Sequence, residues 1–365
     1  MHNRHYWIYW QMLMPGMGRR VWDLFNVLGS PQEAWEATEK ELSEVPFLGA
    51  AAAKKLVKRR ESLQYDKVVQ YLSKIDCTIL TIEDEAYPPL LKTIYDPPPA
   101  VFVRGQLPAG ESISLAMVGS RQPTPYGLAA AESFAGELAG AGLTIISGMA
   151  RGIDSASHRG ALKAEGSTVA VLGCGPDVVY PRENERLMKQ IMEKGAVLTE
   201  FPPGTVPKPW HFPSRNRIIS GLSSAVLVVE AAEKSGALIT ADFALEQGRE
   251  VMAVPGNINS TKSAGANKLI RQGARLITRP ADILEELGLG DIFIHQRRDK
   301  GLEAAGLTPS EKKIIQVLTH LPMSMEQIID QCCLEPKEVA AALTVLEIKG
   351  LTRLLPGKMY AAAGL

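Results

Sequence analysis

The sequence predicts an α/β fold built around a mostly parallel sheet, with a helical region before the sheet and a small separate unit after it. Between residues 113 and 287, short apolar segments alternate with amphipathic segments of helical length. The apolar segments are almost continuously apolar, which is typical of parallel strands buried on both faces. A chain of 365 residues is also too long for one ordinary core, so two or three domains are expected.

Residues 1–75 predict a domain of short helices. Two turns interrupt it, PGMG at 15–18 and PFLG at 46–49, and cationic helix positions follow each turn. The turns lie about thirty residues apart and resemble helix-hairpin-helix (SAM-like) elements, whose backbone N–H groups can hold a phosphate. Phe47 stands where such an element carries glycine. The alternative is a small helical bundle whose basic face, at 54–60, is simply solvated.

Residues 76–290 predict the sheet domain. Proline-rich segments separate its first two strands, which we expect to join the sheet that follows. The expected strands are 77–82, 100–103, 113–118, 143–147, 168–172, 196–199, 225–230, 250–254 and 274–278. The expected helices include 126–140, 153–165, 183–194, 236–247 and 265–272.

A polar stretch at 291–307 is expected to be a linker, and residues 308–365 resemble a winged helix. A capping signal at Thr308 starts the first helix, two more follow at 324–331 and 336–349, and a two-stranded wing spans 351–361. The third helix carries Lys337 and Lys349 but no arginine to read bases. This composition favours a protein-contact or dimerisation module over a DNA reader.

Composition and motifs argue against several function classes. Lysine plus arginine and aspartate plus glutamate both number 40, so any nucleic-acid contact must come from a local patch. The sequence has no P-loop and no G-x-S-x-G elbow, and its four cysteines and six histidines lack metal-ligand spacing. We therefore expect no catalytic residue, metal or cofactor. No apolar stretch reaches the roughly 20 residues of a membrane helix, and we expect a cytoplasmic protein.

Anion-binding chemistry gathers where the predicted strands end. Two windows, 201–229 and 251–281, contain no acidic residue, and parallel sheets bind ligands beyond the carboxyl ends of their strands. We read FPSRNRII at 212–219 as a turn leading into an apolar strand. Glycines, hydroxyls and cations at these positions suit a phosphate pocket. The candidate residues are Gly119, Ser120, Arg121, Ser147, Gly148, Arg151, Gly152, Phe212, Arg215, Asn216, Arg217, Lys234, Ser235, Gly236, Asn267 and Lys268.

Several of these motifs occur in a fixed order that resembles one family. They are VGSR at 118–121, SGMARGID at 147–154, DVVYP at 177–181, FPSRNRII at 212–219, SGALIT at 235–240 and AVPG at 253–256. Together they resemble the DNA-processing protein A family, also called DprA or Smf. The resemblance covers about residues 80–285.

The resemblance implies an extended Rossmann-like fold that binds single-stranded DNA without catalysing a reaction. It further implies protection of incoming strands during natural transformation, loading of the recombinase RecA, and a homodimer formed through the central domain. Carried over by motif, phosphate and sugar contacts fall to nine residues. These are Ser120, Arg121, Arg215, Asn216, Arg217, Lys234, Ser235, Gly236 and Lys268.

Two other functions remain open from the sequence. One is an enzyme resembling nucleotide-monophosphate phosphoribohydrolases, which bind a nucleotide phosphate at similar loops. Those enzymes carry a P-G-G-x-G-T turn with a catalytic glutamate, whereas this chain has KSGALIT at 234–240. The other is a sequence-specific regulator acting through the winged helix, for which the neutral third helix offers little support.

Overall fold

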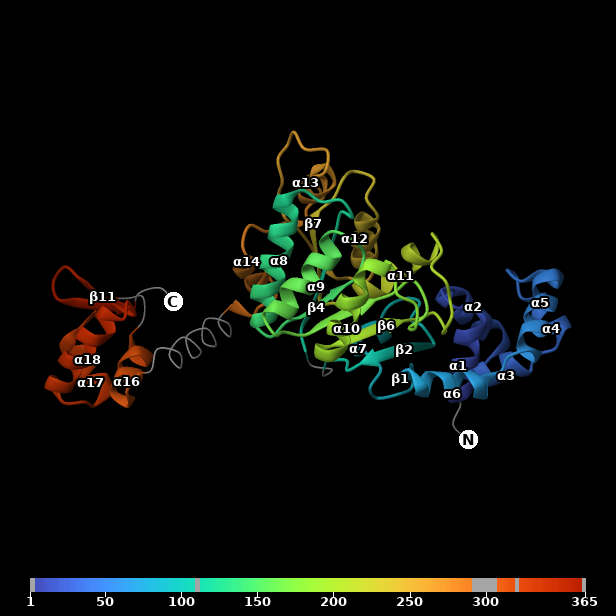
Figure 1. Cartoon of the computed structure of the whole chain (residues 1–365), viewed down its shortest axis with the longest axis horizontal. Coiled ribbons are helices and arrows are strands. Elements are labelled where there is room, and N and C mark those ends of the chain that lie inside the picture. The colour runs from blue at the N-terminus through green and yellow to red at the C-terminus, as the bar shows by residue number, and fades with distance from the viewer. Residues whose placement is uncertain (1–3, 109–111, 291–306, 319–321, 363–365) are drawn as a thin grey trace. The chain divides into compact units, whose positions relative to one another are not determined.

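The computed structural model describes residues 4–108, 112–290, 307–318 and 322–362. Contacts divide the chain into two compact units, Met1–Pro280 and Ala281–Leu365. The linker predicted over 291–307 lies outside the described residues, except for Leu307. The helices expected at 1–75 form part of the first unit, in which they pack beside the sheet (Figure 1).

The core of the first unit is a nine-stranded sheet, which confirms the predicted fold class. Its strand order is β1-β2-β6-β5-β4-β3-β7-β8-β9. From β6 to β9 every neighbouring pair is parallel, whereas β2 is antiparallel to both β1 and β6. The strands are β1 (Cys77–Thr81), β2 (Ala100–Gly105), β3 (Ser114–Gly119), β4 (Thr144–Ser147), β5 (Thr168–Val171), β6 (Ala196–Thr199), β7 (Ala225–Glu230), β8 (Glu250–Ala253) and β9 (Arg275–Leu276).

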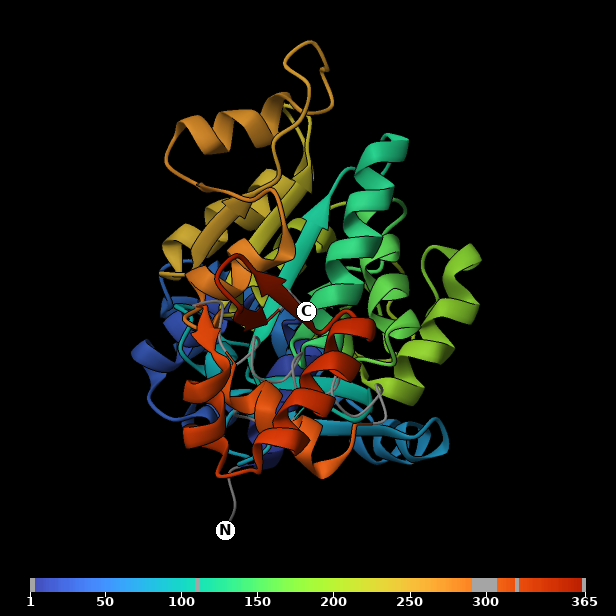
Figure 2. The same cartoon turned by 90° about the vertical axis from the view of Figure 1, so that its left-hand side faces the viewer.

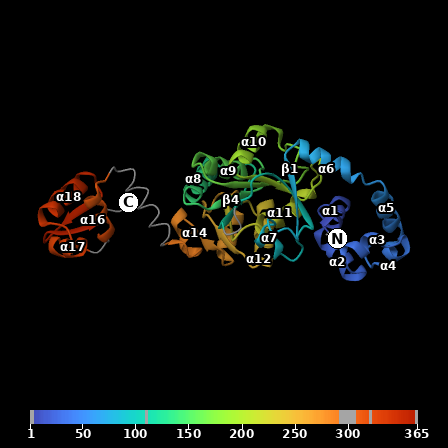
Figure 3. The same cartoon turned by 90° about the horizontal axis from the view of Figure 1, so that it is seen from below.

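Helices cover both faces of this sheet, as the apolar strands require. Figure 3 shows α8, α9 and α10 on one face and α7, α11 and α12 on the other, and Figure 2 shows the twist of the strands between them. The helices are α7 (Pro89–Lys92), α8 (Pro125–Gly140), α9 (Ile153–Lys163), α10 (Glu185–Lys194), α11 (His211–Gly221), α12 (Gly236–Glu246) and α13 (Ala264–Arg271), with a short 3-10 helix at Arg182–Asn184. A further helix, α14 (Pro280–Glu286), begins at the boundary with the second unit.

Six helices precede the sheet and are tied to the sheet region by hydrogen bonds from the buried Gln11 and the half-buried Trp22. Gln11 donates to the carbonyl of Glu200 at 2.6 Å, and Trp22 donates to the carbonyl of Pro97 at 2.8 Å. Helix α1 also packs on β1 and β2. The helices are α1 (Arg4–Leu13), α2 (Gly18–Leu28), α3 (Pro31–Glu36), α4 (Glu39–Glu44), α5 (Gly49–Glu61) and α6 (Tyr65–Lys74).

The segment at 212–219 differs from its prediction, because it lies within helix α11 and not in a turn before a strand. Pro213 is the third residue of this helix, where its missing N–H breaks no intrahelical hydrogen bond. Ile218, Ile219 and Leu222 follow one another at helical spacing and are buried against the sheet. The predicted turn is therefore wrong, and the apolar residues that follow Arg217 belong to the buried side of a helix.

The second unit has the element order expected of a winged helix. Thr308 caps α16 through the predicted capping box with Glu311. The apolar faces of its three helices form a separate core around Ile314, Ile328 and Leu343. The elements are α16 (Pro309–Val317), β10 (Met323–Ser324), α17 (Met325–Cys332), α18 (Pro336–Ile348), β11 (Thr352–Leu355) and β12 (Met359–Ala362).

Candidate nucleic-acid interface

The strand order creates one crevice at the carboxyl edge of the sheet. The chain runs from β3 outward to β6 and later returns to place β7 on the other side of β3. The loops after β3 and β7 therefore leave in opposite directions and open a gap between them, as doubly wound sheets do at their switch point. Both loops contain predicted site residues, and α11 lies beside them.

The loop after β3 is fixed by Glu230 at the end of β7. The N–H of Ser120 donates to the Glu230 carbonyl oxygen at 2.7 Å, and the N–H of Thr124 donates to the Glu230 carboxylate at 3.0 Å. Thr124 also accepts from the N–H of Gly127 and so caps α8. Arg121 is left exposed between these anchors, with its guanidinium carbon 5.2 Å from the centre of the Phe212 ring.

Helix α11 supplies the floor of the crevice. Arg215 is only 3 % exposed and donates to the carbonyl oxygens of Gly148, at 2.7 Å, and Val171. Its Nε donates to Asn216 Oδ1 at 3.2 Å, and the Asn216 amide donates to the carbonyl of Gly236 at 3.2 Å. These bonds join the β4, β5 and β7 loops through a single helix.

The loop after β7 supplies a second cation. Lys234 is exposed, and Ser235 caps α12 by accepting from the N–H of Ala237 at 3.3 Å. Among the residues that the structure describes, neither Lys234 nor Arg121 forms an ion pair. Both charges are thus free to meet an anion near the start of α12, where the helix dipole also favours one. The start of α8 already faces the carboxylate of Glu230.

These loops enclose a cleft of about 690 Å³. It lies between two smaller hollows, of about 370 Å³ beside Tyr180 and about 510 Å³ beside Lys268, and it shares wall residues with both. The predicted residues that line the main cleft are Gly119, Ser120, Arg121, Phe212, Arg215, Asn216, Lys234, Ser235 and Gly236. Gly148 and Arg151 line the hollow beside Tyr180.

Four predicted residues do not line these clefts, and each has a structural role within the fold. Ser147 is buried and donates to the carbonyl of Met117 at 2.6 Å. Gly152 has a φ of +77°, and a Cβ there would lie 2.3 Å from the Ser120 carbonyl oxygen. The Asn267 amide holds the backbone of Gly256 by two hydrogen bonds, of 3.0 and 3.1 Å.

The fourth of these residues is Arg217, and its position differs most from the predicted phosphate contact. It is 3 % exposed and pairs with Glu200 at 2.6 Å and Asp96 at 3.3 Å. Because α11 turns by about 100° per residue, Arg217 faces the sheet and the amino-terminal helices while Asn216 faces the cleft. Its charge is therefore used within the fold, and we remove it from the predicted phosphate contacts.

Arg151 is placed at the rim but is not free. Its guanidinium forms a bidentate pair with Glu183, with both N–O distances at 2.6 Å. This pairing raises the pKa of Arg151 and lowers the pKa of Glu183. Glu183 and the neighbouring Arg182 also line the hollow beside Tyr180, and the sequence analysis missed both. Their only signal was a position directly after the Tyr-Pro pair at 180–181.

Burial shifts the pKa values of two charged groups beneath the cleft, Arg215 and Asp154. Burial lowers the pKa of Arg215 to about 10, so it still carries its proton at neutral pH. Burial also raises the pKa of Asp154, while the charges of Arg215 and Arg121 oppose that shift. The floor of the cleft therefore holds the buried cation Arg215 beside the carboxyl group of Asp154, which lines the same cleft.

Two matches to family models show which protein family this chain belongs to. Residues 78–288 match the family model described as DNA recombination-mediator protein A, and residues 299–358 match that of the DprA winged helix domain. The chain belongs to the DprA family. The second match confirms the winged helix predicted near the carboxyl end.

Relatives within the DprA family cover most of the chain. Protein Smf from Synechocystis sp. is 34 % identical over 97 % of this chain and 98 % of its own. The structure of DprA from Streptococcus pneumoniae covers 78 % of this chain and 98 % of its own, with a TM-score of 0.67 and 35 % identity. DprA from Helicobacter pylori, whose structure was reported for its single-stranded DNA binding mode, covers 59 % of this chain and 97 % of its own, with a TM-score of 0.53 and 28 % identity.

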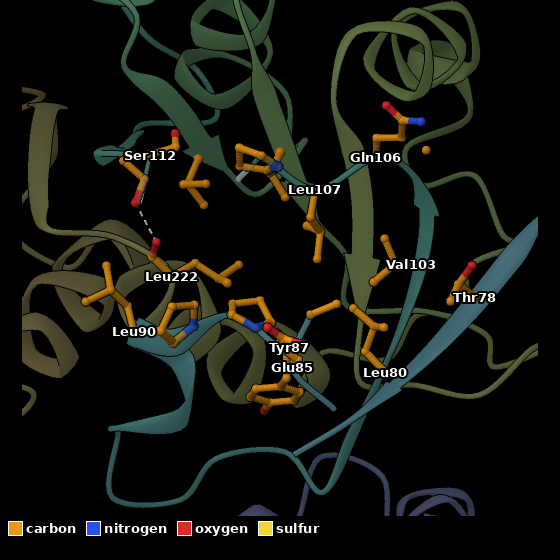
Figure 4. A pocket seen from close by; sticks show the side chains of 18 residues that line it. Thr78, Leu80, Glu85, Tyr87, Leu90, Val103, Gln106, Leu107, Ser112 and Leu222 are labelled. Atoms are coloured by element: carbon orange, nitrogen blue, oxygen red, sulfur yellow. Dashed lines mark hydrogen bonds between the residues drawn. The ribbon is translucent and has the colours of Figure 1, made fainter. Parts of the chain in front are cut away.

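A second hollow lies at the opposite edge of the sheet and has different chemistry. Figure 4 shows this pocket of about 500 Å³, into which Leu80, Val103 and Leu107 project. The hydroxyl of Ser114 donates to the Leu222 carbonyl at 2.6 Å in its wall. Its lining includes Glu85 but no lysine or arginine. A phosphate would find no countercharge among these lining residues.

No helix among the residues that the structure describes has both the length and the apolar composition to cross a membrane. Within the same residues, no group of three or more histidine, cysteine, aspartate or glutamate side chains could hold a metal ion.

Gly148 gives a direct test of the cleft floor. A Cβ at this position would lie 2.3 Å from Arg215 Nη1, so Gly148→Ala must displace a buried guanidinium from its carbonyl partners. We expect a loss of about 1–3 kcal/mol in the free energy of unfolding. Urea denaturation measures it, with Gly140→Ala as the control, because a Cβ there meets only Ala164 at 3.9 Å. Equal stability of the two variants would contradict this role.

Proposed function

We propose that this protein binds the phosphate backbone of single-stranded DNA, without sequence preference and without catalysing a reaction. The observation that carries the proposal is the convergence of Arg121 and Lys234 on one cleft, from loops on either side of the switch point. The reported single-stranded DNA binding of the Helicobacter pylori relative supports the choice of ligand.

The geometry suits a flexible strand. Arg121 can hold a phosphate bidentately, Lys234 adds a point charge, and Ser120 and Ser235 place hydroxyls beside them. Phe212 and Tyr180 lie with their ring centres 5.4 Å apart at the junction of two hollows. A base stacked on such a ring contributes roughly 1–3 kcal/mol whatever its identity. Phosphates and base faces occur in every sequence, so binding of this kind does not discriminate.

The same proposal extends to the partners that the family resemblance implies. We propose that the protein acts in the cytoplasm during natural transformation, where it protects incoming strands and loads RecA onto them. We also propose a homodimer through the Rossmann-like domain. One strand held in two clefts would then bind more tightly through effective concentration.

A panel of labelled strands tests the central proposal. We expect single strands of equal length but different composition to bind with closely similar dissociation constants, because neither phosphate contacts nor stacking reads base edges. Fluorescence anisotropy at one fixed salt concentration provides the measurement. A large preference for one sequence would contradict the proposal and favour base-edge readout.

The enzyme alternative has its own test. The proposal predicts that incubation with AMP releases no free adenine, because the loop after β7 carries KSGALIT and its buried glutamate, Glu230, already anchors Thr124. Chromatography of the reaction mixture measures adenine directly. Turnover that disappears in an Arg121→Ala variant would overthrow the binding proposal in favour of a phosphoribohydrolase.

A further inference from the structure

Helix α5 carries a cationic face that the cleft does not use. Lys54, Lys55, Lys58 and Arg59 are all exposed, while Ala53 and Leu56 on the opposite side are buried. We call these four residues the α5 cationic face. Arg60, the fifth cation, points inward and donates to the carbonyl oxygens of Trp35 and Ala37.

The charges on this face repel one another. Lys54 and Lys58, and likewise Lys55 and Arg59, are four residues apart, so each pair stacks along the helix and is destabilising. Among the described residues, no carboxylate pairs with any of the four. The face therefore concentrates positive charge that no ion pair among the described residues neutralises. An anion bound there would relieve the repulsion.

The two similar turns of the amino-terminal helices have different surroundings. In the first turn, a Cβ on Gly18 would lie 2.7 Å from the Asp96 carbonyl oxygen and 3.1 Å from Arg217 Nη2, so that turn is packed against the sheet domain. In the second turn, Gly49 is exposed with a φ of +60°, and a Cβ there would have no atom within 4 Å. Only the turn that leads into α5 faces open space.

We propose that the α5 cationic face is a second contact for nucleic acid, which holds the phosphate backbone of the same single strand beyond the cleft. The identity of the strand rests on the proposed function, whereas the anion-binding chemistry rests on α5 itself. The face and the cleft belong to one compact unit. Figures 1 and 3 place α5 on the side of that unit where β1 lies, away from α8.

The composition of the face favours a polyanion over a protein partner. Its uncharged exposed neighbours include Ala50, Ala51 and Ser62, and one carboxylate, Glu61, lies a turn after Lys58. The face presents no exposed aromatic or large apolar side chain. Protein interfaces draw most of their affinity from such anchors, which fill pockets on the partner. Phosphate backbones need only a row of cations, because release of condensed counterions drives their binding.

The test is a double variant that removes one stacked pair, Lys55→Gln/Arg59→Gln, in the full-length protein. Its control is Lys67→Gln/Lys74→Gln, which changes the net charge equally on two exposed lysines of the neighbouring helix α6. Oligo-dT of two lengths is titrated over a range of salt concentrations. The short strand fills only a groove of roughly 4–16 nucleotides, and the long strand is several times that length.

We expect the α5 variant to bind the long strand several-fold more weakly than the control does, with a salt slope shallower by about 1.4. Binding of the short strand should match that of the control. The melting temperature of the α5 variant should equal or exceed that of the wild type, because the variant lacks two charges that repel their neighbours. If it does not fold, Lys54→Gln/Lys58→Gln serves the same purpose.

Equal affinities of the variant and the control for the long strand would overturn the inference. Equal losses for both strand lengths would also overturn it, because they would reflect general charge and not a contact beyond the cleft. Arg121→Ala separates the two proposals. If that variant leaves the short strand unaffected while the α5 variant weakens the long one, the cleft assignment fails and the α5 contact stands.

Discussion

Arg121→Ala is expected to weaken binding of single-stranded DNA roughly ten- to hundredfold, because hydrogen bonds to a charged group contribute about 1.5–3 kcal/mol. The side chain is exposed, lines the main cleft and forms no ion pair among the described residues. Its removal also takes a cation from the Phe212 ring. Anisotropy titration of labelled oligo-dT measures the loss.

Arg159→Ala is the matched control for this experiment. Arg159 is an exposed arginine of α9 that lines none of the three connected hollows. We expect the control to bind like the wild type and both variants to keep the wild-type melting temperature. The loss in Arg121→Ala should be similar for strands of different sequence. Indistinguishable binding by the two variants would show that Arg121 does not touch the strand.

Arg217→Ala is expected to act on stability, with a loss of about 3–5 kcal/mol in the free energy of unfolding. The substitution removes the one guanidinium that pairs with both Glu200 and Asp96. Glu200 is 1 % exposed and has one carboxylate oxygen without a hydrogen-bond partner even in the intact protein. Urea denaturation measures the change, again with Arg159→Ala as the control. A loss below about 1 kcal/mol, the range of an exposed pair, would contradict this account.

The loss in Arg217→Ala should shrink as the pH falls. Burial raises the pKa of Glu200 above its ordinary 4.5 and the pKa of Asp96 above its ordinary 3.8, and the charge of Arg217 restrains both shifts. Without Arg217 both pKa values rise further. A carboxyl whose pKa is higher in the folded protein binds more protons there, so protons stabilise the fold.

The pH range of this effect follows from the upward direction of the two pKa shifts. The stabilising effect of protons is complete below the ordinary pKa values and is lost as the pH rises through the folded ones. As the pH falls from neutral toward 4.5, the free energy of unfolding of the variant should therefore approach that of the wild type. His158, whose pKa burial lowers to about 3, is unchanged by the substitution and cancels in the difference. A gap that widened on acidification would contradict the assignment.

The sequence was sufficient to predict the strands and most helices, but not which strands lie side by side in the sheet. Continuous apolar runs predicted all nine strands, and β6 and β7 have the predicted bounds. The order of strands in the sheet leaves no trace in a single sequence, because β7 lies beside β3 although more than a hundred residues separate them. The candidate loops could be named one by one, but only the fold shows that those after β3 and β7 meet.

The errors at Arg217 and around it have one physical origin. We expected a turn in which Arg215 and Arg217 both reach the cleft, but the side chains of a helix point in directions set by its period of 3.6 residues. In helix α11 it is Phe212 and Asn216, four residues apart, that share the cleft side. The acidic partners of Arg217, Asp96 and Glu200, are distant in the sequence, so nothing local indicated that its charge was already satisfied.

The salt dependence of oligo-dT affinity tests the central claim most directly, when wild type is compared with an Arg121→Ala/Lys234→Ala double variant. Each phosphate contact to a single strand contributes roughly −0.7 to the slope of log K against log salt. The account predicts that the double variant binds more weakly, with a slope shallower by about 1.4. An unchanged slope would show that these two cations hold no phosphates, and that the cleft at the switch point is not where the strand binds.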